Sequence, residues 1–268
     1  MVKLVDWGKA KNILIIAFVI TNVFLIYNIE KDLFMESASS MVREENIQDI
    51  INILKEKNIK VEAEVPKIVL ELPLLNVEYE TYDEKKLDEK FYVEDNHKKI
   101  KYEDYDQTAY IKGLDQEKAF DEAENFIKKY GFMRKDAAYW ETREDGEQYQ
   151  ILFKQKYKGR FLEDSYMRLT VSASGVNKFE RMWLKPLGTD KNKKEIIPAT
   201  KALLKAMNDL ETLQGEIIIK NVALGYWFDP SNISLTNSEN IKSGTAVPAW
   251  RILLADGQTL FISAYENY

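Results

Sequence analysis

The chain lacks cysteine entirely, and its 268 residues include a single histidine, His97. Without cysteine there is no disulfide scaffold, no thiol nucleophile and no cysteine-based zinc or iron–sulfur site. One histidine excludes a metal site built from several histidines and makes any Ser-His-Asp triad depend on that residue alone. Most familiar enzyme chemistries are therefore disfavoured.

A basic balance is also missing, because 44 acidic residues outnumber 38 lysines and arginines and give a formal net charge of -6. Nucleic-acid binding in general needs a basic surface that offsets phosphate charge, so we expect no nucleic-acid partner. Hydrophobic residues make up 45% of the chain. That is enough apolar material for one large domain or two of modest size.

Recognisable catalytic motifs are absent as well. His97 lies in the charged segment 94–99, which is typical of a solvated surface histidine. No G-x-S-x-G, H-E-x-x-H or P-loop pattern occurs. The acidic runs at 78–80 and 103–106 lack the regular ligand loop of calcium sites, so solvated faces are favoured. We expect no enzyme activity, no metal and no cofactor, although the sequence alone leaves open an exported hydrolase with paired carboxylates.

What is present first is an uncharged run at residues 12–29, between Lys11 and Glu30. As a helix it would be roughly 27 Å long, which nearly spans a hydrocarbon core of about 30 Å. The run therefore predicts a single transmembrane helix in contact with membrane lipid. Its expected membrane-interface anchors are Trp7, Lys9, Lys11 and Tyr27.

The charges that flank this run predict its orientation. Lysines precede it, whereas acidic residues are frequent after it, at Glu30, Asp32 and Glu36. The positive-inside rule then leaves residues 1–11 in the cytoplasm and places everything after residue 30 outside the cell membrane. The alternatives are a cleaved signal peptide and a buried core helix. A signal peptide needs a shorter apolar region and a nearby small-residue cleavage site, and a core helix would show a polar stripe.

One face of the predicted helix carries small and polar residues. Ala17, Thr21 and Asn28 share this face with Phe24, and Asn22 lies about 100° around the helix. Such residues permit close helix approach and hydrogen bonds across a membrane interface. We expect these five residues to contact a transmembrane partner; the alternative is that isolated threonine and asparagine residues are simply tolerated.

Hydrophobic periodicity predicts three helices in the exported part, at residues 45–57, 115–130 and 194–210. Asp115 suits the N-cap of the second, Gly131 suits its end, and Pro198 falls in the first turn of the third. Strands are expected at 68–72 (stopped by Pro73), 138–142, 148–157, 165–173, 176–184, 216–228, 249–254 and 259–265, with short exposed strands at 91–93 and 100–102.

The second and third helices are each followed by strands, so the pattern predicts an α+β fold with a duplicated helix-plus-antiparallel-sheet unit. The last hairpins match, because Arg168–Gly175 parallels Arg251–Gly257 and an alternating strand follows each. The alternative is that any two amphipathic hairpins look alike. The expected organisation is a cytoplasmic N-terminus (1–11), a transmembrane helix (12–29), a stalk and N-terminal exported region (30–112), a first unit (113–190) and a second unit (191–268).

The two ends of the chain resemble a known family. The opening segment 6–13, which runs into IIAFVITNVFLIY, is similar to the start of YycI-type (WalI-like) proteins. Residues 247–252, Asp256–Gly257 and 261–265 resemble the last hairpin of that family, an ending shared with PepSY-like exported domains. The middle region, 76–112, carries no such resemblance.

The resemblance implies a non-enzymatic role. It implies a membrane-anchored accessory regulator of an essential sensor histidine kinase of the YycG (WalK) type, acting together with a YycH-type sister protein on cell-wall metabolism. Contacts would be made largely through the transmembrane helix. The alternative function is an extracytoplasmic binding module for a wall component or secreted peptide, without kinase contact.

Overall fold

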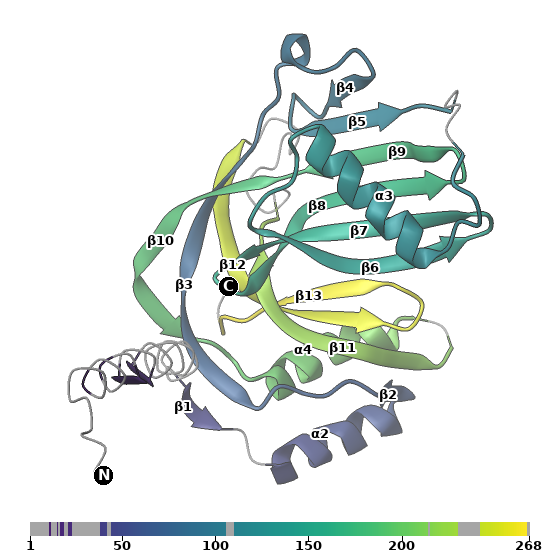
Figure 1. Ribbon diagram of the computed structural model, residues 1–268. Helices are drawn as coiled ribbons and strands as arrows, with labels where there is room; N and C mark the ends of the chain where they lie inside the picture. Colours follow the sequence, from purple (N-terminus) through teal and green to yellow (C-terminus); the bar gives the residue numbers. More distant parts are fainter. Residues whose placement is uncertain are drawn as a thin grey trace, which may run out of the picture.

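The computed structural model describes residues 11, 15, 17, 18, 21, 22, 38–41, 44–105, 110–213, 215–229 and 242–266. From residue 38 onward these residues form a mixed α+β structure, mostly β-sheet, with three α-helices packed on it (Figure 1). This confirms the α+β class that the sequence predicts. In chain order the elements are β1 (Ala38–Met41), α2 (Glu44–Glu56), β2 (Ile59–Val61), β3 (Ile68–Tyr79), η1 (Glu84–Lys86), β4 (Phe91–Glu94), β5 (Lys99–Glu103), α3 (Gln116–Lys129), β6 (Ala137–Asp145), β7 (Gln148–Tyr157), β8 (Arg160–Ser172), β9 (Gly175–Met182), β10 (Leu184–Glu195), α4 (Ala199–Glu211), β11 (Ile217–Trp227), β12 (Ser243–Leu254) and β13 (Thr259–Ser263).

The described strands pair into a 13-stranded sheet whose main path runs β1-β3-β12-β11-β8-β9-β5-β4. Strands β2, β6, β7, β10 and β13 pair alongside this path. Pairing is antiparallel except where β11 meets β2 and β8. From this order we distinguish two halves and an arm. The α3 half is α3 with β4–β9, the α4 half is α2 and α4 with β2 and β11–β13, and the arm is β3 with β10.

In the α3 half, helix α3 lies across the strands and covers one face (Figure 1). The helix begins where the sequence predicts, since the Asp115 side chain accepts a hydrogen bond from the Lys118 N–H at 2.9 Å. It ends before Gly131, which has a φ of 72°. Ala119, Ala123 and Ile127 are buried against the sheet, as their spacing predicts.

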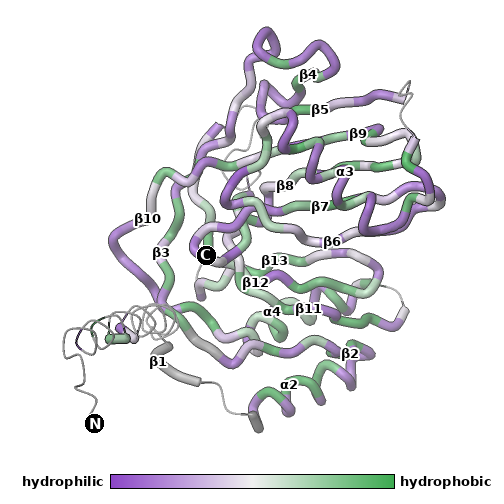
Figure 2. The backbone as a smooth tube through the Cα atoms, in the orientation of Figure 1, coloured by the Kyte–Doolittle hydropathy of each residue, from purple (hydrophilic) through white to green (hydrophobic). Residues whose placement is uncertain are grey.

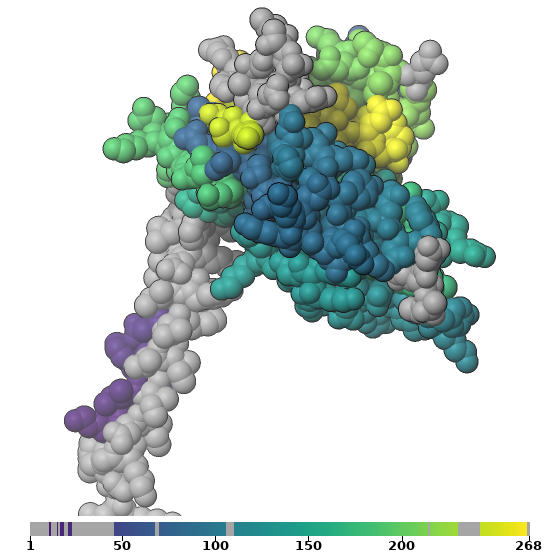
Figure 3. All heavy atoms as spheres, turned by 90° about the horizontal axis from the view of Figure 1, so that it is seen from above, coloured from purple at the N-terminus to yellow at the C-terminus, as the bar shows by residue number. Residues whose placement is uncertain are grey.

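Strands β4 and β5 lie at the end of this half that faces the viewer in Figure 3. The sequence predicts them as exposed, and this is wrong. Phe91, Ile100 and Tyr102 are buried in the α3 core, because β5 pairs with β9 and β4 with β5. One face of each strand is therefore apolar, although the charged residues between them dominate the local sequence.

In the α4 half, helices α2 and α4 contact each other and cover the face of the sheet that carries Trp250 and Ile252. The Trp250 indole donates a hydrogen bond to the Ile197 carbonyl at 2.9 Å. The predicted start of the third helix is wrong: residues 194 and 195 belong to β10, and Pro198 is the N-cap of α4. Proline disfavours a helical conformation in the residue before it, which explains the later start.

The arm was recognised only in part from the sequence. The predicted stop at Pro73 is wrong, because β3 continues to Tyr79. On one edge of β3, Pro73 lies between the segment that pairs with β1 and the segment that pairs with β12. On the other edge it lies next to an irregular stretch of β10. The missing N–H of proline therefore removes little from the hydrogen bonding of the sheet. Strand β10 has no sequence signal, since its run 190–195 is hydrophilic (Figure 2).

No helix among the described residues is long and apolar enough to cross a membrane. The predicted helix 12–29 lies largely outside the described residues, so this prediction stays open. The predicted domain boundaries likewise stay a prediction.

Leu203 tests the packing of α4. Its side chain is fully buried in the α4 core, so Leu203→Ala should lower the free energy of unfolding by about 2–5 kcal/mol. Asn208→Ala, at an exposed position of the same helix, should change it by less than about 0.5 kcal/mol. Urea unfolding of the full chain in mild detergent measures both, and equal losses would contradict the observed orientation of α4.

Candidate functional site

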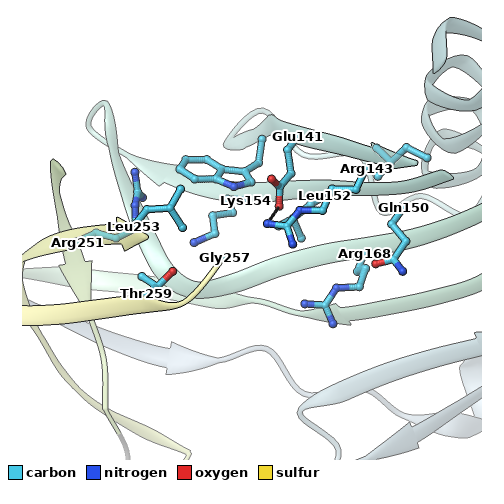
Figure 4. A pocket seen from close by; sticks show the side chains of 12 residues that line it. Glu141, Arg143, Gln150, Leu152, Lys154, Arg168, Arg251, Leu253, Gly257 and Thr259 are labelled. Atoms are coloured by element: carbon cyan, nitrogen blue, oxygen red, sulfur yellow. Dashed lines mark ion pairs between the residues drawn. The ribbon is translucent and has the colours of Figure 1, made fainter. Parts of the chain in front are cut away.

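A groove with a volume of about 320 Å³ lies between strands β6–β8 of the α3 half and the β12–β13 hairpin of the α4 half (Figure 4). Strand alternation explains which side chains reach it. Ile151 and Phe153 of β7 are buried in the α3 core, so Leu152 and Lys154 point the other way. The groove therefore lies on the face of β6–β8 that is opposite to helix α3.

The same alternation operates in the hairpin. Trp250 and Ile252 face the α4 core, whereas Arg251 and Leu253 line the groove. The groove is cationic, because four basic side chains and one carboxylate line it. These charged residues are Arg143, Lys154, Arg168, Arg251 and Glu141.

A buried ion cluster forms the inner wall of the groove. The Glu163 carboxylate of β8 is 1% exposed. It accepts a hydrogen bond from Arg251 Nη1 at 2.6 Å and one from Lys154 Nζ at 2.8 Å. A buried carboxylate is costly unless it is paired and hydrogen-bonded, and Glu163 meets this condition through the two cations. The cluster joins β7 and β8 of one half to β12 of the other.

Glycine permits this close approach. A Cβ atom at Gly225 of β11 would lie 2.6 Å from Glu163 Oε1 and 2.9 Å from the Phe161 carbonyl oxygen. Any side chain at position 225 would therefore collide with the carboxylate.

An aromatic wall completes the setting of Arg251. Its guanidinium lies 4.3 Å from the centre of the Trp140 ring and 5.6 Å from that of Phe161. Trp140 occupies a β-bulge of β6, which turns its side chain away from the regular alternation. Burial lowers the pKa of Arg251, and the Glu163 charge opposes this shift. Arg251 Nε, which is buried, has no hydrogen-bond partner among the described residues.

The other two arginines of the groove are exposed. Arg143, with its side chain 57% exposed, lies 3.0 Å from Glu141. Arg168, 51% exposed, lies 4.0 Å from Glu180 and over the Tyr166 ring. Exposed pairs of this kind contribute little to stability, so both guanidinium groups are available for other contacts.

Asp164, next to Glu163, has a raised pKa. Burial raises the pKa of Asp164 to about 7. A hydrogen bond from the Phe228 N–H, 2.8 Å long, lowers the pKa in part, and the Glu163 charge raises it further. Asp164 therefore titrates near neutral pH.

The structure describes only some of the site residues that the sequence predicts. Lys11, Ala17, Thr21 and Asn22 are helical; the Thr21 hydroxyl donates to the Ala17 carbonyl at 2.9 Å and the Asn22 amide to the Phe18 carbonyl at 2.8 Å. The other predicted residues, Trp7, Lys9, Phe24, Tyr27 and Asn28, lie outside the described residues.

His97 is exposed, as the sequence predicts. No group of three or more acidic or histidine side chains in the described part of the chain is placed to hold a metal ion. Sequence reasoning missed the groove. One signal was available, because Arg168 and Arg251, which the hairpin comparison aligns, both line it.

Comparison with known proteins gives one family. The family model described as YycI protein matches residues 37–265. A crystal structure of an uncharacterized protein from Eubacterium rectale is similar at 10% identity and a TM-score of 0.49, covering 82% of this chain and 97% of that one. The Bacillus megaterium YpeB C-terminal domain is similar at 12% identity and a TM-score of 0.36, covering 86% and 96%. No curated protein matches the chain.

Gly225→Ala tests the close approach to Glu163. The added methyl group would force the carboxylate and the Phe161 backbone apart, so the free energy of unfolding should fall by about 2–3 kcal/mol. The double variant Gly225→Ala/Glu163→Ala should lose less than the sum of its single variants, because the colliding carboxylate is gone. Additive losses in urea unfolding would refute the collision.

Asp164→Asn tests the raised pKa. The folded chain holds the Asp164 proton more tightly than the unfolded chain, so the stabilisation is complete below about pH 4 and is lost as the pH rises to about 7. Asparagine does not ionise, and its carbonyl oxygen still accepts from Phe228. From pH 5 to pH 8 the variant should gain stability relative to the original chain, on the order of 2 kcal/mol. Parallel stability curves for the two proteins would contradict the shift.

Proposed function

Because the chain belongs to the YycI family of accessory proteins of the YycG (WalK) two-component system, we propose that it modulates the activity of this sensor histidine kinase from the membrane. The observation that carries the proposal is the family match over residues 37–265, which spans nearly all of the chain after the apolar run. The role is regulatory and not enzymatic.

The proposal includes a membrane anchor. Residues 12–29 form a single-pass helix in the lipid of the cell membrane, with the N-terminus in the cytoplasm and residues 30–268 outside. The supporting observations are the uncharged length of this run and the lysines before it.

The anchor would also be the contact with the kinase. A helix biases a two-state kinase only if it binds one state better than the other, and a coupling of about 1–3 kcal/mol alters signalling severalfold or more. The face with Ala17, Thr21, Asn22, Phe24 and Asn28 is the proposed contact. Because the Thr21 hydroxyl donates to its own helix, its oxygen can still accept a hydrogen bond from a neighbouring helix.

We also propose a sister protein of the YycH type as a second partner. We further propose that residues 113–190 and 191–268 are duplicated units. In support, each places a helix on antiparallel strands: α3 on β6–β9, and α4 on β11–β13.

A second candidate function is an extracytoplasmic binding module, acting on its own or beside kinase regulation. The observation that favours it is the cationic groove, whose two exposed arginines take part only in surface ion pairs, with Glu141 and Glu180.

Co-purification tests the anchor-contact proposal. The full chain in mild detergent should recover the histidine kinase, and replacing residues 13–29 by an unrelated membrane helix should abolish recovery. Replacing Thr21, Asn22 and Asn28 by leucine should weaken recovery severalfold while leaving membrane insertion intact.

The control is the fragment 31–268 in a deletion strain. Restoration of kinase output by this fragment alone would overturn the helix-contact mechanism, and so would unchanged recovery of the kinase after the helix is replaced.

A further inference from the structure

We propose that the groove between β6 and the β12–β13 hairpin binds an extended acidic peptide segment of a partner protein, with Arg143 and Arg168 as the groups that receive its carboxylates. The proposal stands apart from kinase regulation through the membrane helix, so either can fail without the other.

The groove is more basic than the rest of the chain. It gathers four basic side chains against Glu141 at its surface and Glu163 behind its inner wall, on a chain whose net charge is -6. Two of the four, Lys154 and Arg251, pair with the buried Glu163. The cations that a ligand can reach are therefore Arg143 and Arg168, whose side chains are more than half exposed and whose pairs with Glu141 and Glu180 are at the surface.

Strand edges that are unpaired within the described part of the chain border the groove. Within the described part of the chain, β6 pairs only with β7, and β13 pairs only with β12 (Figure 1). Both strands contribute lining residues, Trp140, Glu141 and Arg143 from β6 and Thr259 from β13. Free main-chain donors and acceptors at a strand edge can pair with an added extended peptide.

These two features together select the ligand. In an extended peptide, alternate side chains point to the same side, so glutamates at every second position would face the arginines while the main chain pairs with a strand edge. A guanidinium binds a carboxylate through two parallel hydrogen bonds, which adds orientation to charge. A small anion would use only the arginines, and a phosphate polymer would leave the strand edges unpaired.

The groove is also prepared in advance. Lys154 and Arg251 are fixed by Glu163, and Trp140 stacks against Arg251, so the inner wall is rigid. Glu141 lies 3.0 Å from Arg143, so an incoming carboxylate must compete with it. A weakly acidic segment would therefore bind poorly, which gives selectivity for a strongly acidic one.

The direct test uses a labelled synthetic peptide in which glutamate alternates with threonine, titrated into the full chain in mild detergent. We expect saturable binding that weakens steeply with added salt. The double variant Arg143→Gln/Arg168→Gln should bind at least about tenfold more weakly, because two charge-assisted contacts are removed.

The matched control is Lys185→Gln/Lys191→Gln, which removes the same charge from exposed positions of β10. It should bind the peptide as the original chain does. An equal loss in this control would show that only net charge matters and would overturn the groove assignment.

Two further probes separate the ligand classes. A glutamine version of the peptide should fail to bind, and a version with N-methyl groups on alternate amides should bind several times more weakly, since it cannot pair with a strand edge. Binding of linear polyphosphate in place of the peptide, with loss in Arg143→Gln/Arg168→Gln, would assign the groove to phosphate polymers and refute the proposal. Absence of peptide binding at low salt would also refute it.

Discussion

The structure depends on the burial of one carboxylate. Glu163 lies at the junction of the two halves, where Arg251 comes from β12 and Lys154 from β7. Removal of the carboxylate would leave two cations without their shared partner, and removal of Arg251 would leave Glu163 with Lys154 alone; either change costs far more than the loss of an exposed ion pair. The buried carboxylate also restricts neighbouring residues. It requires glycine at position 225, and it holds the Arg251 guanidinium against the Trp140 ring.

The same constraint shapes the surface that is available for function. Glu163 holds the two inner cations in fixed positions and leaves Arg143 and Arg168 at the rim, beside strand edges that are free within the described structure. A protein of regulatory type needs binding surfaces and no catalytic groups. A family match over residues 37–265 together with a cationic groove in that part fits such a protein.

Sequence reasoning succeeded where the signal is local. The helices around residues 116–129 and 199–211 follow from apolar spacing, and the turn at Asp256–Gly257 from the freedom of glycine at a φ of 89°. It failed where the structure is determined by pairing between segments that lie far apart in the sequence. Strand β10 is held by β3 despite its charges, and the burial of Ile100 comes from pairing with β9. Glu163 looks like any exposed acid in sequence, because its partners Lys154 and Arg251 meet it only through tertiary structure.

A double-mutant cycle on Glu163 and Arg251 tests the central claim most directly. Urea unfolding of Glu163→Gln, Arg251→Met and the double variant would give the coupling between the two side chains. Each single variant should lose about 3–5 kcal/mol, and the double variant should lose clearly less than their sum, because Glu163→Gln no longer leaves a buried Arg251 charge without its carboxylate. Additive losses, or losses below about 1 kcal/mol, would show that the two halves are held together by something other than this buried pair.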